Sequence, residues 1–104
     1  MTEIIGLLIT KEGCPLCDFA RKTFRKLIEL YPEITFKELQ IHIDEEEEFI
    51  RKFYKIDIVP TLLIIDSNFT KIYCKIEGSK GLKKTKEIID LAIKQGVVDQ
   101  YELK

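Results

Sequence analysis

One stretch near the N-terminus decides the fold of this chain: Ile4-Ile5-Gly6-Leu7-Leu8-Ile9-Thr10-Lys11-Glu12-Gly13-Cys14-Pro15-Leu16-Cys17. It begins with a short, nearly continuous apolar run, which is typical of a strand buried on both faces. A polar loop follows, and Pro15 then fits the first turn of a helix, where its missing N–H is not needed. The stretch therefore predicts a strand, a loop and a helix start that carries Cys14 and Cys17.

The patterns downstream alternate between strand and helix. The first helix continues at helical spacing through Tyr31 and ends at Pro32, and further strands are predicted at 35–43, 61–65 and 71–76. Helices are predicted after Asp44 and over 82–95. The order β-α-β-α-β-β-α predicts an α/β fold with a four-stranded mixed sheet and helices on both faces. Its first two strands are parallel, because a strand–helix–strand unit makes a right-handed crossover.

Several side chains outside the cysteine pair have specific expected roles. In the second helix, Asp44 and Glu47 match a capping box. Phe49 and Phe53 belong to that helix's apolar stripe, with Ile50 and Tyr54, and Glu45 to Glu48 form a solvated start.

Charged residues of the first helix and two other reactive side chains are also expected to be structural. Asp18 suits the helix dipole, and Arg21 is expected on a solvated face with the neighbouring lysines and arginine. His42 is expected as a partnered structural residue on a central strand. Cys74 is expected to pack on the late hairpin.

Composition and length limit the classes of function. The chain has 104 residues, 45% hydrophobic and 34% charged, which predicts one domain, 1–104, with the tail 97–104 unassigned. A net charge of -1 gives no reason to bind nucleic acid or an anionic membrane. The apolar start lacks a basic leader, so we expect a cytoplasmic protein, and a monomer.

The cysteine pair favours disulfide exchange. A free cysteine has a pKa of about 8.5, and a helix N-terminus lowers it. Cys14 is expected at that position with Lys11 nearby, so we expect it to be the nucleophile. Cys17 lies one turn further on the apolar stripe, within reach of Cys14, and is expected to resolve the mixed disulfide. Leu16 and the loop with Val59 are expected to form an apolar rim that favours protein or peptide substrates.

Two other interpretations of the pair stay open. Both cysteines could be small core residues, or they could bind a metal or an iron–sulfur cluster with His42 or Cys74. A structural zinc needs about four ligands, and the sequence has no second Cys-x-x-Cys, so no metal site is predicted. A phosphatase loop is excluded, because six residues rather than five separate Cys14 from Arg21.

The segment Lys11-Glu12-Gly13-Cys14-Pro15-Leu16-Cys17-Asp18 resembles the glutaredoxin pattern Lys-x-x-Cys-Pro-aromatic-Cys, with leucine in place of the aromatic residue. Ile58-Val59-Pro60-Thr61 resembles the segment that carries the cis-proline of the thioredoxin superfamily. Residues 76–81 are similar to the last turn of thioredoxin. The chain is thus identified as a small glutaredoxin-like or thioredoxin-like member of this superfamily.

The resemblance implies a thioredoxin-like fold and a thiol–disulfide oxidoreductase that takes part in electron transport and redox homeostasis. It implies a cis bond before Pro60, which faces the cysteines in the family and helps to hold the substrate backbone. Lys11, Pro15, Leu16, Val59, Pro60 and Gly78 are the expected substrate-binding residues. No cofactor is expected to stay bound. Glutathione and a thioredoxin reductase are alternative external reductants, and a non-catalytic interaction module is a further alternative.

Overall fold

The computed structural model describes residues 3–95. The chain begins with β1 (Ile4–Thr10), α1 (Pro15–Leu30) and β2 (Ile34–Gln40). It continues with α2 (Glu45–Phe53), β3 (Thr61–Asp66), β4 (Ile72–Glu77) and α3 (Leu82–Gln95). The predicted β-α-β-α-β-β-α order is confirmed. The predicted tail, 97–104, lies outside the described residues.

The four strands form one mixed sheet in the order β2-β1-β3-β4. Strands β1 and β2 are parallel, with Thr10 opposite Gln40, whereas β3 runs antiparallel to both β1 and β4. Gly6 of β1 leaves no room for a side chain, because a Cβ there would lie 2.4 Å from the ring of Phe36 on β2. The two central strands, β1 and β3, are the ones whose sequences are nearly continuous apolar runs.

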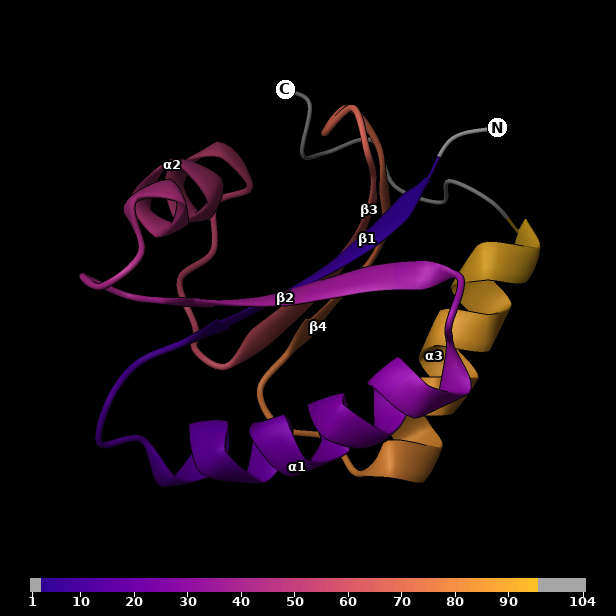
Figure 1. Ribbon diagram of the computed structural model, residues 1–104, viewed down its shortest axis with the longest axis horizontal. Coiled ribbons are helices and arrows are strands. Elements are labelled where there is room, and N and C mark those ends of the chain that lie inside the picture. The colour runs from indigo at the N-terminus through magenta and orange to yellow at the C-terminus, as the bar shows by residue number, and fades with distance from the viewer. Residues whose placement is uncertain (1–2, 96–104) are drawn as a thin grey trace.

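Helices cover both faces of the sheet, as predicted. Figure 1 shows α1 and α3 together on one side and α2 on the other. The core under α1 and α3 contains Phe24 and Leu27 of α1 and Ile89 of α3, packed on sheet residues such as Ile64. The α2 core contains Ile50 and Tyr54, packed with residues such as Leu7, Leu63 and Ile65. The fold is thioredoxin-like, with the start of α1 placed at the carboxyl end of β1.

The second strand differs from the prediction. It ends at Gln40 rather than at Ile43, and it is an edge strand of the sheet. His42 therefore lies in the turn after the strand, exposed and at a φ of 68°, and the prediction of a central strand position was wrong. The alternating apolar pattern misled the prediction because Ile41 and Ile43 continue it beyond the end of the strand.

Half of the predicted apolar stripe of the second helix faces the core, because Ile50 and Tyr54 are buried. Phe49 and Phe53 stack on each other on the outside, with 62% and 40% of their surfaces exposed, so their assignment to the core was wrong. Glu47 is buried instead of solvated, since its carboxylate pairs with Arg51 Nε at 2.5 Å. The predicted capping box is absent: Asp44 is the N-cap, but its side chain accepts a hydrogen bond from Gln40 N.

Among the described residues, no helix is both long enough and apolar enough to span a membrane.

Candidate active site

The site is built where β1 ends and α1 begins. Gly13, at a φ of 65°, turns the chain into the helix, and Cys14 is the N-cap in an extended conformation. Pro15 occupies the first helical turn, as predicted. Because Gly13 is free to adopt the left-handed conformation, the loop can turn sharply and deliver Cys14 to the positive end of the helix dipole.

Cys14 and Cys17 form a disulfide, with a Cα–Cα distance of 5.1 Å. The backbone N–H of Cys17 also donates a hydrogen bond to Cys14 Sγ at 3.1 Å. Cys17 is fully buried and Cys14 retains 8% of its surface exposed. When the pair is reduced, the same N–H and the helix N-terminus stabilise a thiolate on Cys14, whereas burial disfavours one on Cys17.

The loop before β3 forms a second wall of the site. The Val59–Pro60 peptide bond is cis, as the resemblance implied, and Pro60 is buried. The N–H of Gly78 donates to the carbonyl of Pro60 at 2.8 Å, so the turn after β4 supports this loop. Thr61 Oγ1 also donates to the carbonyl of Ile58 at 2.5 Å. The backbone of the loop is thus held by both of its neighbours.

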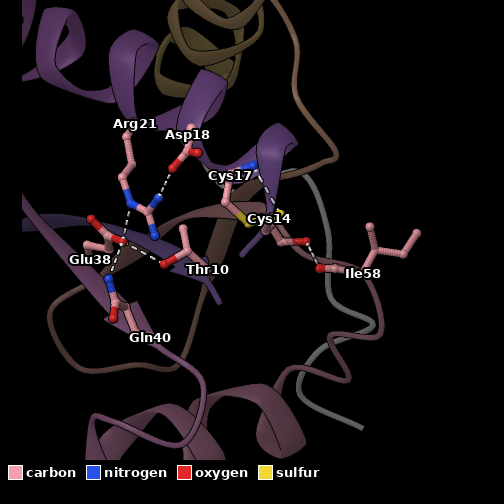
Figure 2. The surroundings of a disulfide bond; sticks show 9 residues. Thr10, Cys14, Cys17, Asp18, Arg21, Glu38, Gln40 and Ile58 are labelled. Atoms are coloured by element: carbon pink, nitrogen blue, oxygen red, sulfur yellow. Dashed lines mark hydrogen bonds and ion pairs between the residues drawn. A yellow bond between two sulfur atoms is a disulfide. The ribbon is translucent and has the colours of Figure 1, made fainter. Parts of the chain in front are cut away.

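Apolar side chains occur in the first turn of α1 and in the loop before β3, near the cysteine pair. Leu16 and Ile58 are exposed by 59% and 47%, and Val59 is half-buried. In Figure 2, Ile58 lies on one side of the disulfide and a polar network lies on the other. Leu16 and Val59 were expected as rim residues, whereas Ile58 was not singled out, although the sequence shows it one residue before Val59.

Lys11 is exposed and lines an open groove of about 640 Å³ between its own loop and the connection from β2 to α2. Ile41, His42 and Arg51 also line this groove. Lys11 thus brings a positive charge to this groove.

The network on the other side of the disulfide was missed at the level of sequence. Glu38 of β2 accepts hydrogen bonds from Thr10 Oγ1 at 2.6 Å and from Arg21 Nε at 2.7 Å (Figure 2). Arg21 is therefore not solvated as expected: only 19% of its side chain is exposed. A signal for Glu38 exists, because strand alternation places it on the same face as Phe36, which packs against the α1 core.

The ionisation of Glu38 follows from these contacts. Burial acts to raise the pKa of its carboxyl group, but hydrogen bonds from Thr10, Arg21 and Gln40 outweigh that effect and hold the pKa below its usual value. Glu38 is therefore an anion at neutral pH. For Cys74 on β4, by contrast, burial acts without such hydrogen bonds from the described residues and raises the pKa of the thiol to about 12.

Several solved thioredoxins share this fold. Thioredoxin F from spinach chloroplast is 25% identical, with 88% of this chain and 78% of that chain covered and a TM-score of 0.71. Thioredoxin-2 of a malaria parasite is 13% identical, with 86% and 84% covered and a TM-score of 0.73. Thioredoxin from Trypanosoma brucei brucei is 16% identical, with 88% and 75% covered and a TM-score of 0.72. These likenesses show the thioredoxin fold.

No curated protein matches the chain. The family model of the glutaredoxin-like domain (DUF836) matches residues 7–95, which include the end of β1, the cysteine pair, the cis-proline loop and α3. With the thioredoxin fold and the Cys-x-x-Cys pair at the start of α1, this match shows that the chain belongs to the glutaredoxin-like domain family (DUF836) of the thioredoxin superfamily.

Proposed function

We propose that this protein is a thiol–disulfide oxidoreductase that reduces disulfides of proteins or peptides through a Cys14/Cys17 dithiol–disulfide cycle. The observation that carries the proposal is the disulfide between an N-cap cysteine and a buried cysteine one turn later, in a fold whose loop before β3 carries a cis-proline. The two sulfurs differ in the way that the two steps of disulfide exchange require.

In the first step, the Cys14 thiolate attacks one sulfur of a substrate disulfide. A Cys14–substrate disulfide forms, and the other substrate sulfur leaves as a thiolate. In the second step, Cys17 loses its proton to solvent and attacks Cys14 Sγ. The first substrate sulfur then leaves, so two electrons have passed to the substrate and Cys14–Cys17 is oxidised.

The surroundings of Cys14 favour an extended peptide as the substrate. Leu16, Val59 and Ile58 offer apolar contacts, and Pro15, Pro60 and Gly78 keep the nearby backbone in a fixed shape. We expect Lys11, which lines an open groove, to meet an acidic group of the substrate or of the reductant. We propose that the protein works as a monomer in the cytoplasm, where thiols are kept reduced.

An external dithiol or two thiols must reduce the Cys14–Cys17 disulfide after each cycle. Glutathione with its reductase and a thioredoxin reductase are the two proposed electron sources. Supplying each system separately, and following NADPH consumption in the presence of a protein disulfide, distinguishes them.

The assignment is tested with insulin reduction under dithiothreitol. We expect Cys14→Ser to lower the rate to that of the uncatalysed reaction, because no nucleophilic sulfur remains at the N-cap. Cys17→Ser is expected to accumulate a mixed disulfide on Cys14, visible by mass spectrometry. Cys74→Ser is the matched control and should keep the full rate, whereas full activity of Cys14→Ser would refute the assignment.

A further inference from the structure

Three charged side chains form a chain beside the cysteine pair. Arg21 Nη1 donates to Asp18 Oδ1 at 2.6 Å, and Arg21 Nε donates to Glu38 Oε2 at 2.7 Å. Figure 2 shows this chain next to the disulfide, with Asp18 and Arg21 coming from α1 and Glu38 from β2. One guanidinium thus bridges two carboxylates from different elements, and the three groups carry a net charge of -1.

The Glu38 end of the chain is anchored to the sheet. Thr10, which has no exposed surface, donates to Glu38 Oε2 at 2.6 Å, and Gln40 Nε2 donates to the same oxygen at 3.3 Å. The carboxylate therefore connects the end of β1 and the edge strand β2 to the first turns of α1. Donors in fixed positions keep it charged and prevent it from turning toward solvent.

The Arg21 end of the chain lies on the face of the helix that carries Cys17. The two residues are four apart, which places their Cβ atoms about 5–6 Å from each other on a helix. Asp18 follows Cys17 directly, and its N–H donates to the carbonyl of Cys14 at 3.1 Å. Asp18 and Arg21 therefore lie within about one turn of Cys17, and the net negative charge of the three groups acts against the positive end of the helix dipole.

We propose that the linked side chains of Asp18, Arg21 and Glu38 set how readily the reduced Cys14–Cys17 pair ionises. Glu38 and Arg21 are positioning residues, because they act through their charge on the cysteines and do not touch the substrate. The net negative charge destabilises a thiolate on Cys14. The reduced form is then less favoured relative to the disulfide, so the reduced pair is a stronger reductant. The role of these three side chains in turnover rests on the proposed function, but their effect on thiol ionisation does not.

Other charged groups near the pair are exposed to solvent, which screens them. They lie in the loop before α1, on α1 itself, in the loop before Pro60 and in the turn after β4. These residues are Lys11, Glu12, Lys22, Asp57, Glu77 and Lys80. Among the three linked side chains, Arg21 and Glu38 are partly buried, with 19% and 25% of their side chains exposed. They should therefore act more strongly on the cysteines than the exposed charges do.

Opposite substitutions test the proposal by the sign of their effects. In reduced protein, iodoacetamide labelling of Cys14 is followed against pH by peptide mass spectrometry. Glu38→Gln keeps the shape and removes the anion, so the apparent pKa of Cys14 should fall by about 0.5 to 1 unit. Arg21→Gln removes the cation and should raise that pKa by a similar amount, and Arg21→Lys should largely restore it.

The matched control is Glu46→Gln, which removes an exposed carboxylate paired with Lys37 at 2.6 Å, between α2 and β2. It should leave the pKa of Cys14 unchanged. Shifts of equal sign in Glu38→Gln and Arg21→Gln would indicate simple loosening of the helix and overturn the proposal, as would a Glu38→Gln value equal to that of Glu46→Gln. If Arg21→Gln does not fold, the Glu38→Gln shift relative to Glu46→Gln decides. Because labelling uses no disulfide substrate, these results are independent of the insulin assay.

Discussion

Cysteines occur in two regions of this molecule, and their environments are opposite. Cys14 caps α1, where the N–H of Cys17 reaches its sulfur at 3.1 Å and the backbone dipoles favour a thiolate. Cys74 lies on β4 against the core under α1 and α3, where burial raises the pKa of its thiol to about 12. The same residue type is therefore prepared for nucleophilic attack in one region and kept inert in the other. The difference comes from the backbone N–H groups at the start of α1 rather than from the thiol itself.

The contrast should produce its largest effect in alkylation rates. At pH 8, a thiol with a pKa of about 12 is ionised in about one molecule in ten thousand. We expect iodoacetamide to label Cys74 of the reduced, folded protein at least about a hundredfold more slowly than Cys14, although the more basic thiolate is the better nucleophile. Mass spectrometry of the labelled peptides measures both rates. Unfolding in urea should make all three cysteines react alike, and equal rates in the folded protein would remove the contrast.

A second effect should appear in stability at alkaline pH. The pKa of Cys74 is raised from 9.0 to about 12 by folding, so its contribution to stability is fully present below pH 9 and is lost as the pH rises through 12. With the Cys14–Cys17 disulfide intact, Cys74 is the free thiol in the described structure. Between pH 8 and pH 10, we expect the free energy of unfolding to fall by about 1.4 kcal/mol more in the wild type than in Cys74→Ala.

Urea denaturation at the two pH values measures this difference. The Cys74→Ala variant carries every other titrating group, so it corrects for the lysines and tyrosines that also ionise in this range. An identical loss of stability in both proteins would contradict the raised pKa of Cys74 in the folded state.

The smallest expected effect concerns the backbone that delivers Cys14. Gly13 has a φ of 65°, and a Cβ added there would meet nothing within 4 Å. Gly13→Ala should therefore destabilise the protein by about 1 kcal/mol through backbone conformation alone. Gly81→Ala is the matched control, because that glycine also has open space around it and no positive φ. Thermal unfolding of both variants checks the prediction, and equal stabilities would contradict it.

Much of the fold was predictable because its signals are local. The apolar runs of β1 and β3, the period of α1 and the proline at its first turn each lie within one short segment. The predicted bounds of α3 match the structure, and the predicted strands differ from the observed ones by a few residues at their ends. The errors are at β2 and α2, where the apolar period continues into a turn at His42 and where two aromatic residues, Phe49 and Phe53, face solvent.

The sequence by itself determined the order of elements and the placement of Cys14 and Cys17 at a helix start, since helix periodicity and proline stereochemistry act within a few residues. Only the tertiary structure decided what surrounds the pair. Thr10 and Arg21 meet Glu38 across 28 and 17 residues of chain, and the cis-proline loop meets the turn at Gly78 through one hydrogen bond. Such contacts depend on strand pairing and helix packing, so the charge beside the cysteines emerges only when β1, β2 and α1 come together.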